Sequence, residues 1–207
     1  MNYYQEAASQ EANQSFTPSK EIKGMRVAGK LEINTYGAAV LQFTKPTKTD
    51  KPFTLNAWLN AVDFDKVQAF EGQTQEAANI KAIQKQLRLF KNIARNYQTE
   101  EVVNKAFAST SSFEELVAAL NSCLPDNVAE IEGRLVAGYK LNAKDNNWYL
   151  TIPASMEWDG DNKRFLPFFT TSVDAPTRNL PDAYKLERPE VSTEVGADEV
   201  ATPVVEF

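Results

Sequence analysis

The hydrophobic pattern of this chain has a period of two residues, then of three to four, and then of two again. The segments 26–34, 38–44 and 53–59 are short runs in which apolar and polar residues alternate, and glycine or proline turns separate them. Alternation between turn residues is typical of antiparallel strands, so we expect three strands in this first part of the chain.

The pattern becomes helical in the middle of the chain. Apolar residues in 74–97 recur every three or four positions, which predicts a helix with one buried stripe. The stripe consists of Ala77, Ile80, Ile83, Leu87, Phe90, Ile93, Ala94 and Tyr97. A shorter helix is expected over 99–107. Ser112 and Glu115 fit a capping box that starts a third helix over 113–123.

Period two returns in 131–141 and 148–152, and a final hairpin is expected over 156–171 around a turn at 159–162. Strands followed by helices and then by strands again predict an α+β fold. Short antiparallel strands of this kind fit an OB-like β-barrel or another small sheet, with a helical insertion at about 63–123.

Both ends of the chain differ in composition from its middle. Residues 1–22 are polar and are expected to form a flexible N-terminal arm, ahead of an α+β binding domain at 23–185. The segment 186–207 has six acids and one base and is expected to be a flexible acidic tail. Because the whole chain has 28 acids and 22 bases, residues 1–185 are nearly neutral.

The composition excludes several classes of enzyme. The chain has no histidine, which rules out Ser-His-Asp and Cys-His catalysis, histidine-bound zinc and the facial-triad iron site. Cys123 is the one cysteine and is expected to be a buried apolar residue at a helix end. The acids at 159–162 fit a hairpin turn better than a calcium loop, and no phosphate-binding glycine loop is present. We therefore expect no enzymatic activity, no catalytic residue, no metal and no cofactor.

The sequence also contains no sign of a membrane partner. No apolar stretch is long enough to cross a bilayer, and the N-terminus lacks the basic and apolar regions of a secretory signal. We therefore expect a cytoplasmic protein, located in the host cytoplasm if a phage encodes it.

Aromatic and basic residues occur together in the expected strands and turns. Proteins bind single strands by stacking bases on aromatic rings, at roughly 1–3 kcal/mol per base, beside cations that contact phosphates. We therefore expect a single-stranded DNA site on the sheet. Its expected residues are Lys30, Lys45, Lys48, Lys51, Trp58, Arg134, Tyr139, Lys140, Trp148, Tyr149, Trp158 and Arg164. Trp148 and Tyr149 are neighbours on a strand, so they should point to opposite faces and at least one should face outward.

A further basic series has helical spacing. It consists of Lys81, Lys85, Arg88, Lys91 and Arg95. Such a series could follow a phosphate backbone, but it is more often the solvated face of an amphipathic helix, and we interpret it in that way.

The acidic tail ends in phenylalanine. Its main residues are Glu194, Asp198, Glu199, Glu206 and Phe207. In this respect it resembles the tails of bacterial single-stranded DNA-binding proteins and of analogous proteins of tailed phages. The stretch 124–153 is also similar in cadence to phage proteins of this type. The resemblance implies a role in phage-type replication or recombination, with a tail that competes with DNA. It also implies that Asp198, Glu199, Glu206 and Phe207 recruit replication or recombination proteins.

Other functions fit the same sequence. The main alternative is a structural or packaged component of a phage virion, in which the two tails are ordered arms that wrap neighbouring subunits. A regulator that mimics DNA would need negative charge on a folded face, and the nearly neutral body argues against it. A carboxylate-based enzyme is a further alternative, although no site for one is recognisable. A homo-oligomer is compatible with each of these functions.

Overall fold

The computed structural model describes residues 21–48 and 51–189. Most of the arm expected at 1–22 and of the tail expected at 186–207 lies outside the described residues, including the expected partner-binding residues of the tail. Strand β1 (Glu21–Val27) takes up the last two residues of the expected arm.

The described residues form strands at both ends and helices between them. The other strands are β2 (Glu32–Ile33), β3 (Ala38–Lys45), β4 (Phe53–Asn60), β5 (Glu132–Val136), β6 (Gly138–Asn142), β7 (Asn147–Thr151), β8 (Glu157–Asp159), β9 (Arg164–Leu166), β10 (Phe169–Thr170) and β11 (Tyr184–Lys185). The helices are α2 (Gln75–Ala94), α3 (Glu100–Ala106) and α4 (Phe113–Cys123), with short 3-10 helices at Phe64–Lys66 and Val128–Glu130.

The strands of the described part pair antiparallel and form three sheets. The largest has the order β10-β5-β1-β3-β2, with β4 also paired to β3. The second has the order β11-β6-β7, and β8 and β9 form a separate hairpin. Strands β4 and β7 approach each other without pairing, so the described strands do not close a barrel. The expected α+β class with antiparallel sheets is confirmed, whereas the OB-like barrel is not.

Two of the expected strands are broken in the structure. The run expected over 26–34 ends at Val27, bends, and resumes as β2. The run expected over 131–141 leaves the large sheet after Val136 and continues in the second sheet as β6. At the change of sheet, a Cβ on Gly138 would lie 3.0 Å from a Leu180 methyl carbon and 3.1 Å from the Lys185 carbonyl oxygen. The alternation continues through this point, so the sequence pattern does not reveal the change of sheet.

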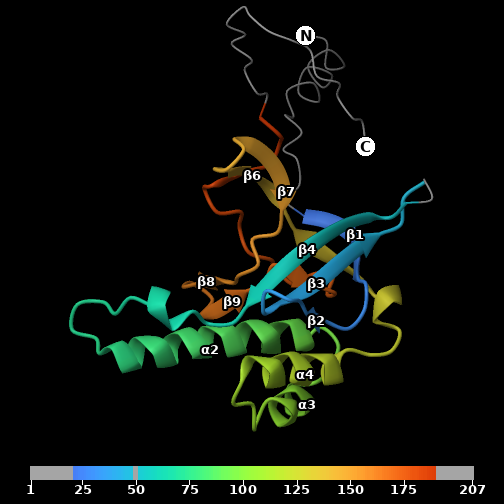
Figure 1. Ribbon diagram of the computed structural model, residues 1–207. Coiled ribbons are helices and arrows are strands. Elements are labelled where there is room, and N and C mark those ends of the chain that lie inside the picture. Colours follow the sequence, from blue (N-terminus) through green and yellow to red (C-terminus); the bar gives the residue numbers. More distant parts are fainter. Residues whose placement is uncertain (1–20, 49–50, 190–207) are drawn as a thin grey trace, which may run out of the picture.

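The helices cover one face of the six-stranded sheet (Figure 1). Leu41 and Phe43 of β3 share one core with Phe90 of α2 and Leu120 of α4. The ring of Phe43 also lies edge-on to Phe168, with the ring centroids 6.2 Å apart. The core therefore fixes α2 against the sheet through the C-terminal half of the helix.

Each of the three α-helices is preceded by a side-chain hydroxyl that accepts a hydrogen bond from the first turn. In α4 this residue is Ser112, which accepts from the N–H of Glu115, as the capping box predicts. The Glu115 carboxylate also accepts from the N–H and hydroxyl of Ser111, the residue before the cap. These hydrogen bonds lower the pKa of Glu115.

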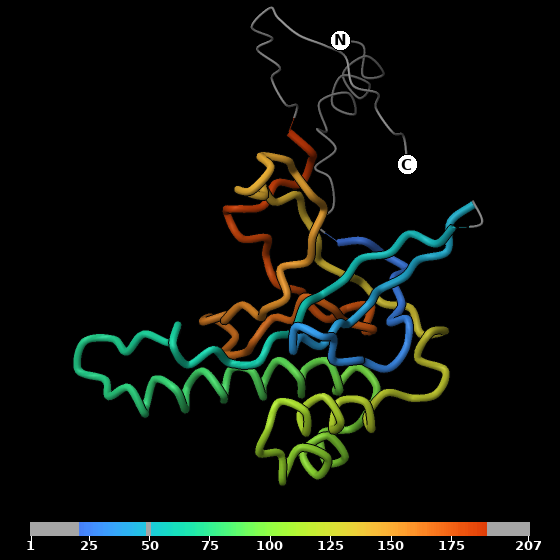
Figure 2. The backbone as a smooth tube through the Cα atoms, viewed as in Figure 1, coloured from blue at the N-terminus to red at the C-terminus, as the bar shows by residue number. Residues whose placement is uncertain are grey.

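The stripe expected to be buried along α2 is buried only in its second half. Phe90, Ile93 and Ala94 are buried, whereas Ile80 and Ile83 are 49% and 43% exposed. Figure 2 shows the cause, because the first half of α2 and the loop before it project beyond the sheet and α4. The stripe is thus a core surface at one end of the helix and an open surface at the other.

Cys123 is buried at the end of α4, as expected, and burial raises the pKa of its thiol. Within 21–48 and 51–189, no helix combines the length and apolar character needed to cross a bilayer. In the same residues, cysteine and acidic side chains form no group of three that could hold a metal ion.

Candidate nucleic-acid interface

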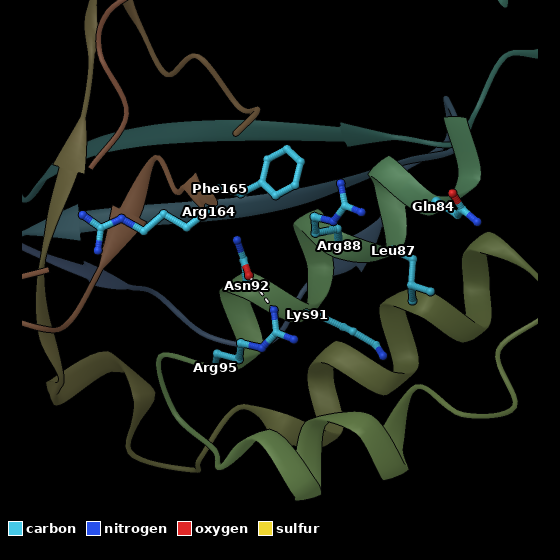
Figure 3. Close-up of a pocket in the computed structure, with 8 residues that line it drawn as sticks. All are labelled: Gln84, Leu87, Arg88, Lys91, Asn92, Arg95, Arg164 and Phe165. Atoms are coloured by element: carbon cyan, nitrogen blue, oxygen red, sulfur yellow. Dashed lines mark hydrogen bonds between the residues drawn. The ribbon is translucent and has the colours of Figure 1, made fainter. Parts of the chain in front are cut away.

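A groove lies between helix α2, the β8–β9 hairpin and the end of β4. It consists of two adjoining hollows with volumes of about 480 and 580 Å³. Gln84 and Arg88 of α2 and Phe165 of β9 line both hollows. The first hollow continues along α2 to Arg95 (Figure 3), and the second reaches Trp58 on β4.

The helical side of the groove is positively charged. The cations that line it are Lys81, Lys85, Arg88, Lys91 and Arg95. Lys91 donates a hydrogen bond to Asn104 at 2.9 Å, and Arg95 forms an ion pair with Glu100 at 2.6 Å that lowers the pKa of that carboxyl. Among the described residues, the lining of the two hollows includes no carboxylate. Lys81, Lys85 and Arg88 therefore give the middle of the groove a positive charge that an anion can reach.

Three flat groups lie in contact at the groove, namely the guanidinium of Arg88 and the rings of Phe165 and Trp158. The Arg88 guanidinium lies 4.2 Å from the centroid of the Phe165 ring, and Figure 3 shows that the neighbouring Arg164 points the other way. The Phe165 ring in turn lies 4.8 Å from the Trp158 ring, with their planes tilted by 54°. Trp158 and Phe165 are cross-strand partners, which places both rings on one face of the hairpin. Trp158 is 53% exposed, so the stack can be extended by a further flat group.

A buried arginine holds the chain that leads into the hairpin. Arg178 is 7% exposed and donates to the carbonyl oxygens of Pro153 and Ser155 at 3.3 and 3.1 Å, as well as to the Ser155 hydroxyl. Burial lowers the pKa of this guanidinium. The N–H of Asn179 donates to the Glu157 carboxylate at 2.6 Å. These contacts fix the start of β8 and hence the position of the aromatic rings.

Two side chains of α2 fix the other walls of the groove. Asn92 donates from its amide to the sulfur of Met156 at 2.6 Å, which ties the helix to the segment before β8. Gln86 donates to the carbonyl oxygen of Asn60 at 2.6 Å, which ties the helix to the end of β4. Helix α2 is therefore joined directly to each of the other two sides of the groove.

Comparisons of the chain with protein-family models, with curated protein sequences and with solved structures give no match. The function can therefore be inferred only from the groove and its residues.

Three of the expected DNA-binding residues lie at this groove. Trp58 lines the second hollow and is 52% exposed. Trp158 stands at the edge of the groove in the stack with Phe165. Arg164 lines the first hollow and forms an ion pair with Asp159 at 3.5 Å.

Another four lie on the three-stranded sheet, namely Tyr139, Lys140, Trp148 and Tyr149. Lys140 pairs across the strands with Tyr149 on one side and Tyr184 on the other, and its amino group lies 5.5 Å from the Tyr184 ring. Tyr149 is half exposed and donates to Asp145 at 2.6 Å, which raises the pKa of its hydroxyl. Trp148 is less exposed, as the opposite orientation of two strand neighbours predicts.

The remaining five expected residues are Lys30, Lys45, Lys48, Lys51 and Arg134. The three lysines at 45–51 lie at the tip of the β3–β4 ribbon, at the far end from the hairpin (Figure 1). Lys30 lies on the bend after β1. Arg134 forms an ion pair with Glu21 at 2.9 Å and donates to the carbonyl oxygens of Ser172 and Ala175, so the fold itself uses its charge. The structure thus divides the expected site among separate surfaces.

The α2 cations and one ring of the groove were not expected at the site, namely Lys81, Lys85, Arg88, Lys91, Arg95 and Phe165. The spacing of the basic series is visible in the sequence, but a solvated helix face has the same spacing. Phe165 falls in the expected hairpin, yet nothing in the sequence indicates that this hairpin returns to α2. The contact between the Arg88 guanidinium and the Phe165 ring is therefore a product of the tertiary fold.

Proposed function

We propose that this protein binds single-stranded DNA along the α2 groove, as a non-enzymatic component of a phage-type replication or recombination system. The observation that carries the proposal is the contact of Arg88, one of a series of groove cations, with the ring of Phe165, which in turn lies against the exposed ring of Trp158. Unpaired nucleotides offer flat bases beside a negatively charged backbone, and this groove complements both features.

The arrangement of the groove suggests how a strand would lie. The basic series from Lys81 to Arg95 extends about 21 Å along the helix, at 1.5 Å per residue. A phosphate backbone along this series would turn its bases toward Trp58, which lines the second hollow, and toward Phe165 with the neighbouring ring of Trp158. A duplex keeps its bases inside its own stack, so the rings would add little to its binding.

The acidic tail forms part of the proposal, although it lies outside the described residues. Its net charge of −5 would compete with phosphates for the groove cations at low ionic strength. With DNA bound, Asp198, Glu199, Glu206 and Phe207 would be free to recruit replication or recombination proteins. Deleting residues 187–207 should then tighten the binding of oligo-dT at low salt. An unchanged dissociation constant would exclude competition by the tail.

The main experiment is a titration that follows tryptophan fluorescence. Two of the three tryptophans, Trp58 and Trp158, lie at the groove. We expect oligo-dT to quench the fluorescence of the full chain, and we expect duplex DNA of the same length to bind far more weakly. The binding of oligo-dT should weaken steeply between low and moderate salt, because released counterions drive it.

A pair of charge-reversal variants serves as a matched control. Lys85 and Lys105 are both exposed helical lysines, and only Lys85 lines the groove. Lys85→Glu should weaken the binding of oligo-dT, whereas Lys105→Glu should leave it nearly unchanged. Equal effects of the two variants would remove the groove from the proposal. If the full chain bound no single strand even at low salt, the alternative of a virion component would replace DNA binding.

A further inference from the structure

We infer that the second hollow of the groove is a pocket for a single nucleobase, an inference that rests on the proposed function. This hollow of about 580 Å³ lies between the end of β4, the middle of α2 and the segment before β8. Its lining includes the aromatic residues Trp58 and Phe165 and the apolar residues Leu89 and Met156. It is therefore an aromatic and aliphatic recess that opens directly from the cationic part of the groove.

The exposure of Trp58 is the first argument for a flat ligand. Its β4 neighbours Ala57 and Leu59 are buried in the core on the other face of the sheet, while Trp58 remains 52% exposed. Its cross-strand partner is Val40 of β3. Among the described residues, no second aromatic ring packs against the Trp58 indole. An indole in a recess with an open face offers a stacking surface for a planar group.

The polar groups around the hollow further restrict the kind of ligand that fits it. The amide side chains of Asn60 and Gln84 line it, and amides can both donate and accept hydrogen bonds, as the edges of bases do. Lys81, Lys85 and Arg88 lie on the helical side, and no carboxylate is among the described lining residues. The ligand that fits is therefore a flat, mostly apolar ring with polar edges and an attached anion. A nucleobase with its neighbouring phosphate has all of these features.

With such a pocket, the two hollows would bind bases in different ways. The stack of Arg88, Phe165 and Trp158 accepts the face of a base at the surface of the groove. The recess beside Trp58 takes one base out of the line of the strand. A base that enters the recess must leave its neighbours, which a base held in a duplex does only at a cost in unpairing and unstacking.

A variant that narrows the hollow tests the inference without changing any charge. Ala82 is half buried on α2 and lines the hollow, whereas Ala77 on the same helix is exposed and does not line it. Ala82→Leu and Ala77→Leu make the same chemical change, and leucine is nearly as good a helix former as alanine. Each variant is made in the full chain and titrated with short oligo-dT and with an oligomer of the same length that has only abasic sites.

The wild-type chain should bind oligo-dT more tightly than the abasic oligomer. Ala82→Leu should reduce that preference by about 5- to 150-fold, the contribution of one stacked base. Its binding of the abasic oligomer should stay the same, because phosphate contacts are unaffected. Ala77→Leu should behave as wild type. A 5-iodouracil oligomer should also crosslink on irradiation to Trp58 or Met156.

Two results would overturn the inference in distinguishable ways. If Ala82→Leu kept the full preference for oligo-dT and no crosslink formed at Trp58 or Met156, the pocket would be excluded while DNA binding stood. If the wild-type chain bound neither oligomer, both the pocket and the proposed function would fail.

A titration with thymidine monophosphate shows whether the ligand of the pocket is a DNA strand or a free nucleotide. Binding far weaker than that of oligo-dT assigns the pocket to a strand, and equal binding would overturn that assignment.

Discussion

The Arg88 guanidinium and the Phe165 ring lie 4.2 Å apart, and their contact joins the middle of α2 to the β8–β9 hairpin. Neither element forms a binding surface alone, since the helix supplies charge and the hairpin supplies rings. A cation held over an aromatic face contributes roughly 0.5–1 kcal/mol at an exposed site. The contact thus stabilises the groove modestly and keeps a positive group beside the stacking surface.

Arg88 should contribute both charge and stacking to DNA binding. Arg88→Ala is expected to weaken the binding of oligo-dT and to reduce the slope of log K against log salt by about 0.7, the value for one phosphate contact on a single strand. Arg88→Lys should restore the slope but only part of the affinity, because an ammonium group lacks the planar guanidinium. Salt titrations of the three proteins measure both effects. A slope that stayed the same in Arg88→Ala would show that no phosphate contacts this residue.

Gly133 allows strands β5 and β10 to approach each other closely. A Cβ at this position would lie 2.5 Å from a ring carbon of Phe169 and 2.7 Å from the Thr170 carbonyl oxygen. Gly133→Ala is therefore expected to lower the free energy of unfolding by about 1–3 kcal/mol, as overpacking in a core does. Gly29→Ala is the control, since an added Cβ there meets nothing within 4 Å. Urea denaturation compares the two variants, and equal midpoints would contradict the prediction.

Tyr97 should make the protein less stable in alkaline solution. Its hydroxyl is buried without a hydrogen-bond partner in the described residues, and burial raises its pKa well above the usual value of about 10. Above that pH the unfolded chain loses this proton while the folded chain keeps it. The free energy of unfolding therefore falls as pH rises through this range.

Tyr97→Phe should remove this part of the pH dependence. At neutral pH the variant should be at least as stable as wild type, because no hydrogen bond is lost. Urea denaturation at neutral pH and at about pH 11 measures the difference between variant and wild type. Tyr36→Phe is the control, since Tyr36 is 91% exposed. If Tyr97→Phe lost as much stability with pH as wild type does, the ring would be solvated in the folded protein.

Arg178 should affect both stability and binding, although it lies outside the groove. Arg178→Met removes the donors to the carbonyl oxygens of Pro153 and Ser155, and leaving such groups unpaired costs about 1–3 kcal/mol. The segment before β8 would then be less well fixed, so the affinity for oligo-dT should also fall. Lys105→Met removes an exposed cation outside the groove and the tail and should alter neither property. Loss of stability with unchanged affinity would show that the hairpin does not depend on Arg178.

The sequence predicts the local structure well where local chemistry determines it. The helices start at Thr74, Thr99 and Ser112, because each side chain accepts a hydrogen bond from the first turn. The strands 38–45 and 53–60 follow their alternation. The change of sheet after Val136 could not be predicted, because it depends on contacts of Gly138 with Leu180 and Lys185, which are far away in the chain.

The candidate site was predictable only in part, for the same reason. The aromatic residues Trp58 and Trp158 were expected at the site from their residue type and strand positions. The cations of α2 were visible as a series, but only the return of the hairpin to the helix places them in a groove with an aromatic ring. Ile80 and Ile83 illustrate the limit, since their spacing matches buried positions although no described element covers them fully.

The contacts of Arg178 and Asn179 set a limit on how far this protein can be shortened from its C-terminal side. A fragment that stopped after β10 would still contain the whole basic helix and the groove rings of Trp58, Trp158 and Phe165. It would lack the two residues that anchor the segment carrying those hairpin rings. The shortest version with an intact binding surface must therefore include the return path of the chain through residue 179.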